Sequence, residues 1–171
     1  MIILSDISNV KMGVCAVTFG NVPLGHTKGG VTVTYEPDIH DITVDQYGST
    51  PAEKVLIGQK LRATVPLAES SIANLAIAIP AGENSASSIK IGGDVGLRLS
   101  DAAETLVLHP VANDDDDLSE DVVIYKAVVT NSIDIPFKVD EERVIELEFE
   151  GIIDETRLDG DMLGLIGDSS A

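Results

Sequence analysis

The sequence predicts a mainly β protein, a β-sandwich or barrel whose open side is plugged by one flanking α-helix. Three observations lead to this fold class. Several segments alternate between apolar and polar residues, one stretch has helical periodicity, and 44% of the chain is hydrophobic. The 171 residues fit a single domain, residues 1–171, which is long enough to bury a sizeable core.

The expected strands are segments in which every second side chain is apolar. The clearest reads IELEFE and puts three apolar residues on one face and the glutamates Glu146, Glu148 and Glu150 on the other. Such alternation is typical of a strand with one face in the core and one in solvent or facing a channel. The alternating or β-branched segments are residues 31–35, 42–44, 61–65, 122–129 and 145–150.

One helix is expected within residues 67–80, where apolar side chains recur at i, i+3, i+4 and i+7. Ser70 or Ser71 can cap its start, and Pro80 ends it. The apolar stripe consists of Ile72, Leu75, Ala76 and Ile79.

Two further regions are expected to leave the body of the domain. Residues 38–59 contain turn-forming Gly48 and Pro51 and are interpreted as a long loop. Residues 151–171 are interpreted as a C-terminal arm. Its apolar residues must be covered, either by a neighbouring subunit or by this same chain. They are Met162, Leu163, Leu165 and Ile166.

The chain is strongly acidic, with 11 Lys and Arg against 29 Asp and Glu, and its formal net charge is −18. This balance argues against a protein that binds the DNA backbone, because such proteins gather Lys and Arg against phosphates. Sixteen of the 29 acids lie in residues 112–121 and 140–161.

The acidic run Asp114, Asp115, Asp116 and Asp117 lacks the spacing and the loop glycine of an EF-hand, so we interpret it as a solvated loop. The glutamates of residues 145–150 are more informative, because like charges on neighbouring strands destabilise a sheet. Two explanations stay open for them, namely solubility through net charge and a surface that repels a polyanion.

Signatures of catalysis are missing from the sequence. It has no phosphate-binding loop, no Gly-x-Ser-x-Gly, no Cys-x-x-Cys and no His-Glu-x-x-His. Cys15 lies in an apolar run and is interpreted as a small buried residue, and a single cysteine allows no internal disulfide. We therefore expect no enzyme, no catalytic residues, no metal and no cofactor. The short apolar start and the apolar residues 72–79 fit neither a signal peptide nor a membrane span, so a soluble protein is expected.

Residues 16–80 resemble the tail tube proteins, or major tail proteins, of long-tailed bacteriophages. The resemblance begins with Phe19–Gly25 (FGNVPLG) and a strand at 30–36. It continues through a long hairpin or loop that contains Val44–Pro51 (VDQYGSTP), and it ends with a strand at 60–66 before the helix. Later residues resemble the family in pattern only, with strands, an acidic loop and a late acidic strand.

The resemblance implies a β-sandwich with a flanking helix that assembles into hexameric rings. Rings would stack into a hollow tube through which DNA leaves the capsid without specific binding. The partners would be other copies and other tail proteins (tape measure, terminator, baseplate or tip), with no membrane. The protein would be made in the host cytoplasm and reside in the virion tail.

By position, residues 41–59 would stack one ring on the next, and residues 1–11 and 151–171 would be extended terminal arms. Part of the acidic residues Asp114–Asp117, Glu146, Glu148 and Glu150 would line the lumen. The candidate stacking contacts are Tyr47, Val55, Leu56, Ile57, Leu163, Leu165 and Ile166.

Three other interpretations remain open. A tail terminator or a tube protein of a type VI secretion system would share the fold, and a terminator would cap a tube instead of polymerising. A secreted calcium- or carbohydrate-binding β-sandwich would need surface aromatic residues, and only 4% of this chain is aromatic.

Overall fold

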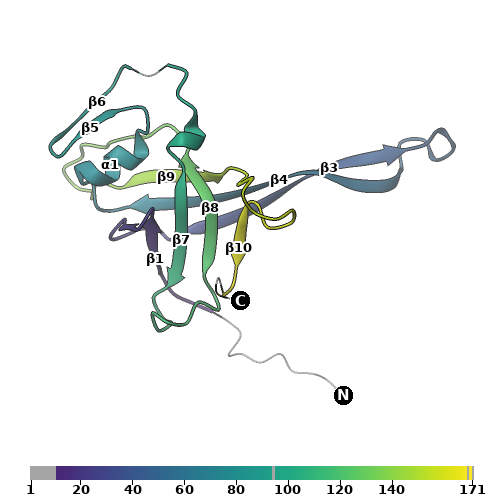
Figure 1. Ribbon diagram of the computed structural model, residues 1–171, viewed down its shortest axis with the longest axis horizontal. Coiled ribbons are helices and arrows are strands. Elements are labelled where there is room, and N and C mark those ends of the chain that lie inside the picture. Colours follow the sequence, from purple (N-terminus) through teal and green to yellow (C-terminus); the bar gives the residue numbers. More distant parts are fainter. Residues whose placement is uncertain (1–10, 94, 169, 171) are drawn as a thin grey trace.

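The computed structural model describes residues 11–93, 95–168 and 170, and within them an eight-stranded antiparallel sheet forms the body. The sheet order is β2-β1-β7-β8-β9-β4-β3, and β10 pairs with β8 beside this path. Figure 1 shows β7 and β8 running across the direction of β4 and β9. The strands are β1 (Cys15–Phe19), β2 (Val22–Pro23), β3 (Thr32–Thr43), β4 (Pro51–Leu67), β7 (Glu104–Pro110), β8 (Val122–Val129), β9 (Ile145–Gly151) and β10 (Gly164–Ile166).

Smaller elements accompany this sheet. A separate hairpin joins β5 (Glu83–Ser85) to β6 (Ser88–Lys90), and single 3-10 turns lie at Asp45–Tyr47 and Leu99–Asp101. The expectation of a mainly β chain with one α-helix is confirmed for the described residues.

The core lies where the inward faces of β1, β4, β7, β8 and β9 meet in one cluster. On β9 the predicted alternation is confirmed, because Ile145, Leu147 and Phe149 are fully buried while the glutamates point outward. The Phe149 ring lies 5.3 Å from that of Phe19 on β1, so strands at the two ends of the chain meet in the same core.

The segment after β2 links the two sides of the sheet. The backbone N–H of Leu24 donates to Val17 of β1, and a few residues later that of Lys28 donates to Pro66 of β4. These two hydrogen bonds join β1 and β4, which lie far apart in the strand order of the sheet. Cys15 packs at the edge of this core, and its partial burial raises the pKa of its thiol.

Helix α1 (Ile72–Ala78) forms where it was predicted, and the Ser71 hydroxyl accepts a hydrogen bond from the Asn74 N–H as its N-cap. The predicted stripe is partly wrong, because Ile72 is exposed while Asn74 and Ala78 are buried. Asn74 can be buried because its amide donates to the carbonyl oxygens of Leu24 and Glu69 at 3.0 and 2.9 Å.

Residues 38–59, expected as a long hairpin or loop, form a two-stranded arm made of the outer halves of β3 and β4. Figure 1 shows it projecting far beyond the body. The two strands stay paired from Thr32 opposite Thr64 to Thr43 opposite Pro51, with register shifts after Asp38 and after Ile42.

The expected terminal arms have different outcomes. Residues 151–167 do not extend away from the domain as expected, because β10 pairs with β8 and Gly167 donates to the backbone of Asp121. In the described residues this segment folds back on its own chain, while Ile166 stays 70% exposed. In the other expected arm, residues 1–10 lie outside the described residues.

Candidate assembly surfaces

The arm is a twisted hairpin with apolar side chains on its surface. Ile39 lies opposite Leu56, His40 opposite Val55, and residues that face each other across two strands share one side of the hairpin. The arm ends in the 3-10 turn Asp45–Tyr47 and at Gly48, whose φ of 62° favours glycine.

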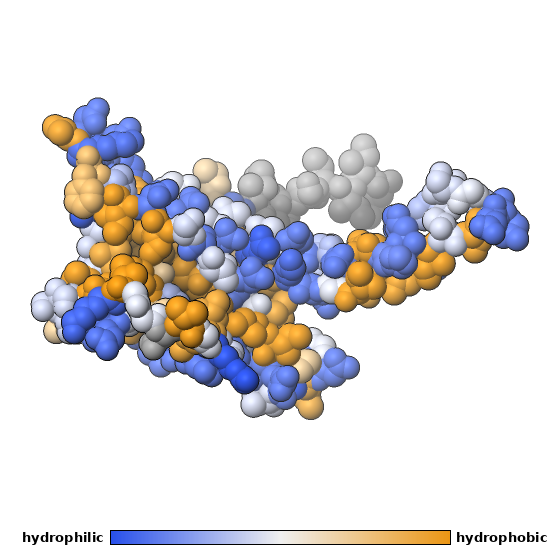
Figure 2. Space-filling model, turned by 90° about the horizontal axis from the view of Figure 1, so that it is seen from above, coloured by the Kyte–Doolittle hydropathy of each residue, from blue (hydrophilic) through white to orange (hydrophobic). Residues whose placement is uncertain are grey.

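Four of the predicted stacking residues lie on this arm and are exposed. The exposed fraction is 65% for Tyr47, 61% for Ile57, 49% for Leu56 and 41% for Val55. Figure 2 shows apolar side chains gathered along one side of the projecting arm. In the isolated chain no body residues cover them, which is the arrangement expected of a surface that a partner covers.

On the side of the arm that carries Leu56, an acidic and a basic residue neutralise each other. Asp41 lies opposite Lys54, and the lysine Nζ is 2.6 Å from the Asp41 carboxylate. This cross-strand pair shares its side of the hairpin with Ile39 and Leu56, because both positions are two residues away along their strands.

At the root of the arm the apolar surface continues into an open groove of about 460 Å³. Tyr35 and Gln59 line it from the arm, and Met162 and Ile166 line it from the segment that contains β10. The Tyr35 hydroxyl donates to the Gln59 side chain at 3.1 Å, so the wall on the arm side is held by a hydrogen bond.

The three C-terminal candidates are separated by this fold. Leu163 packs against the core, Leu165 is half-buried, and Ile166 is exposed at 70%. Of these three residues, Ile166 alone presents most of its side chain for contact with another molecule.

Polar contacts fasten the same segment to β8. The Tyr125 hydroxyl donates to Asp161 at 2.6 Å, and the Arg157 guanidinium lies 3.6 Å over the Tyr125 ring and pairs with Asp161. The hydrogen bond from Tyr125, followed by that from Arg157, lowers the pKa of Asp161 below its ordinary value.

The outward face of β9 is acidic but contains one cation that the sequence pattern did not place there. Arg62 of β4 lies opposite Glu150, and its guanidinium nitrogens are 3.5 Å from Glu148 and Glu150 and 3.8 Å from Glu36. A cluster of three carboxylates around one arginine replaces the uniformly acidic face that we expected.

The second group of predicted acidic residues lies elsewhere. Asp114–Asp117 form the exposed turn between β7 and β8, next to the N-terminal end of β8. The glutamates lie on β9, which pairs with the C-terminal residues of β8. In this turn the Ser119 hydroxyl and N–H donate to Asp117 and lower the pKa of its carboxyl group. The fold therefore does not bring the two acidic groups together.

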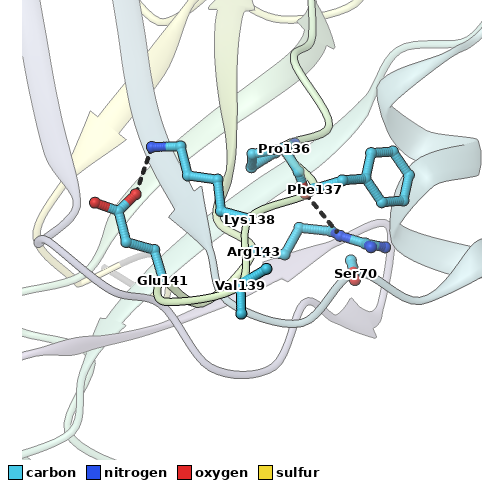
Figure 3. A pocket seen from close by; sticks show the side chains of 7 residues that line it. All are labelled: Ser70, Pro136, Phe137, Lys138, Val139, Glu141 and Arg143. Atoms are coloured by element: carbon cyan, nitrogen blue, oxygen red, sulfur yellow. Dashed lines mark hydrogen bonds and ion pairs between the residues drawn. The ribbon is translucent and has the colours of Figure 1, made fainter.

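An exposed apolar loop between β8 and β9 was missed by the sequence analysis. Phe137 is 82% exposed, and the Arg143 guanidinium lies 4.3 Å from its ring centroid (Figure 3). Apolar residues at positions 133, 135, 137 and 139 alternate with polar residues or proline, a pattern that could have revealed this loop.

None of the helices in the described part of the chain is long and apolar enough to span a membrane. The same part of the chain holds no group of three or more His, Cys, Asp and Glu side chains arranged to bind a metal ion. No family model and no curated protein matches this chain.

Proposed function

We propose that this chain is a structural virion protein that polymerises as stacked hexameric rings into the hollow tail tube of a long-tailed bacteriophage. The proposed tube is a conduit for DNA ejection, and the chain has no enzymatic role in it. The observation that carries the proposal is the arm, which holds apolar side chains in solvent well away from the core.

A two-stranded hairpin gains little stability by itself in water, and three or more strands or a packing partner are needed for independent stability. Exposed apolar residues on such an arm therefore favour a state in which another subunit covers them. Burying a leucine, valine or isoleucine side chain contributes about 1.5–3 kcal/mol, so a few such residues suffice for a specific contact between rings.

Open sheet edges support lateral contacts within a ring. β3 ends the path of paired strands on one side, and on the other side the two-residue β2 covers only the last residues of β1. Unpaired edges invite pairing with another chain, and pairing of unlike edges around a closed ring would leave no edge exposed.

The charge of the chain fits a conduit for a polyanion. Six copies, each at −18, would carry about −108 in all. With a Debye length of about 8 Å at physiological salt, an acidic lining would act on DNA within a narrow pore and keep it from sticking. We propose that the face of Glu146, Glu148 and Glu150, or the turn Asp114–Asp117, contributes to such a lining.

The test is negative-stain electron microscopy and sedimentation velocity of the purified chain over a concentration series. We expect hollow tubes of stacked rings for the wild-type chain. The matched control replaces residues 40–55 with Asn-Gly, which joins Ile39 to Leu56 through a two-residue hairpin turn. This shortened variant should stay folded and should not stack.

Two results would contradict the proposal. A wild-type chain that stays monomeric over the whole series has no tendency to form a tube. A shortened variant that stacks as well as the wild type would show that the arm is not the contact between rings. Single rings that never stack would favour a tail terminator instead.

A further inference from the structure

We propose that the pocket formed by Phe137 and Arg143 receives the arm tip of a second copy of this chain. Copies would then join head to tail along the long axis of the molecule. This inference rests on the proposed function, in which the arm is the contact between rings, and it specifies the surface that accepts the arm.

The pocket is open, has a volume of about 440 Å³ and lies between the loop before β9 and Ser70, just before α1. Figure 3 shows Phe137 and Arg143 side by side on its wall. The Arg143 Nε donates to the Pro136 carbonyl at 3.1 Å, and the guanidinium stays over the Phe137 ring. Two contacts therefore fix the guanidinium and leave its terminal nitrogens available to a ligand.

Arg143 lacks a carboxylate partner among the described residues. Charged residues near it in the sequence do have partners of opposite charge. Lys138 pairs with Glu141, and Glu142 pairs with Lys28. In a chain with a net charge of −18, most cations are expected to have acidic partners. An arginine held on an exposed aromatic ring without one is suited to bind an acidic and aromatic segment.

The arm tip has that chemistry. Tyr47 is 65% exposed, and Val44 and Asp45 lie beside it in the turn. Asp41, the next acid towards the body, is already paired with Lys54, whereas Asp45 has no cation partner in the described part of the chain. Tyrosine and arginine are also the residue types that most often dominate binding energy at protein interfaces.

The positions of the two surfaces determine the kind of assembly. Figure 1 shows the arm tip at one end of the longest axis and the loop before β9 near α1 at the other. The arm of a chain therefore points away from its own pocket. A contact between unlike surfaces at opposite ends is heterologous, so each added copy offers a new tip and the assembly can continue.

Charge reversal at each surface tests this contact. We expect Arg143→Glu to raise the concentration at which stacking begins by roughly tenfold or more, because a carboxylate then faces Asp45. Asp45→Arg should have a similar effect, and the double variant Asp45→Arg/Arg143→Glu should recover stacking. The matched control is Arg98→Glu, an equal change at an exposed arginine that lies outside the pocket.

Mixing provides a second test. The two charge-reversed surfaces would attract each other, so the mixing variants carry alanine instead. Tyr47→Ala/Asp45→Ala loses the tip and keeps an intact pocket, whereas Phe137→Ala/Arg143→Ala loses the pocket and keeps an intact tip. We expect neither alanine variant to stack by itself. A mixture of the two should form assemblies twice the size of those that either variant forms alone, and these should grow no further.

Disulfide trapping locates the contact directly. In a Cys15→Ser background, chains with Tyr47→Cys and Val139→Cys should cross-link between subunits under oxidising conditions. The control pair Tyr47→Cys and Ile166→Cys, which tests the groove at the arm root, should not.

The outcomes separate this inference from the proposed function. If Arg143→Glu stacks like Arg98→Glu, or if the tip cross-links to position 166 and not to position 139, the inference is overturned while the role of the arm stands. If the variant with the shortened arm stacks like the wild type, the proposed function and this inference both fail.

Discussion

Two leucine-to-alanine substitutions, Leu56→Ala on the arm and Leu147→Ala in the core, should have opposite effects on stability and assembly. Leu147 is fully buried on β9, whereas Leu56 is 49% exposed. The chemistry of the change is the same in both variants, so any difference between them comes from the surroundings of the side chain.

The magnitudes follow from burial. Removing a buried leucine costs about 2–5 kcal/mol of unfolding free energy, so Leu147→Ala at about 3 kcal/mol should lower the Tm by roughly 6–12 °C. Leu56→Ala should change the unfolding free energy by less than about 0.5 kcal/mol, because exposed positions contribute little to stability.

In the assembly the larger effect is expected from Leu56→Ala. About half of the Leu56 surface remains to be covered, and full burial of a leucine contributes about 1.5–3 kcal/mol. Losing about 1 kcal/mol weakens each contact about fivefold. If six contacts form together between two rings, the effect multiplies, and the concentration needed for stacking should rise steeply.

Urea denaturation of the monomer and sedimentation velocity over a concentration series measure the two effects separately. The reasoning is refuted if Leu56→Ala destabilises the monomer as much as Leu147→Ala, because the arm would then depend on contacts with its own body. Normal stacking by Leu56→Ala would refute the arm as an interface.

Three further predictions concern the body of the domain. Ser71→Ala removes the N-cap of α1 and should lower the unfolding free energy by about 1 kcal/mol in urea denaturation, whereas Ser71→Asp should retain it. Gly164→Ala would place a Cβ 2.6 Å from the Leu61 side chain, so it should displace β10 and increase proteolysis of the C-terminal segment, unlike Gly93→Ala, whose added Cβ would meet no atom within 4 Å. Asp161 has a lowered pKa when folded, so its stabilising contribution is complete above the ordinary value of 3.8 and is lost as the pH falls through the folded value. The urea midpoint of Asp161→Asn should accordingly fall less on acidification than that of the wild type, and an equal fall in both would contradict the assignment.

The local elements could be predicted because their signals lie in adjacent residues. The alternation of β9 determined which face is buried, and Ser71 and Pro80 bounded the helix. The face of the helix could not be predicted from its apolar stripe. Asn74 is buried through hydrogen bonds to carbonyl groups, and one of these belongs to Leu24, fifty residues away in the chain.

The arm was expected as a long hairpin or loop, and its full pairing could not be predicted because its sequence alternates only at residues 42–44. Pro37 and Pro51 interrupt it, and register shifts after Asp38 and Ile42 move apolar residues out of a regular two-residue period. The candidate contacts Tyr47, Val55, Leu56 and Ile57 lie on the arm, but their exposure depends on how far it projects, and no local pattern encodes that.

Contacts between segments that are distant in the sequence were the hardest to predict from the sequence. The position of Arg62 among three glutamates depends on the register of β4 with β9 and with β3. In the same way, Phe137 and Arg143 come together only because the loop before β9 turns back on itself.

The strand order also has a consequence for folding during synthesis. The β3–β4 hairpin is local in the sequence. In contrast, β1 cannot pair until β7 has been synthesised about ninety residues later, and β4 cannot pair with β9 until β9 has been synthesised. Local pairing is faster than pairing between distant segments. We therefore expect the apolar arm to form on a nascent chain whose core is still open. Repulsion among chains of net charge −18 would then keep neighbouring nascent arms apart until each body closes.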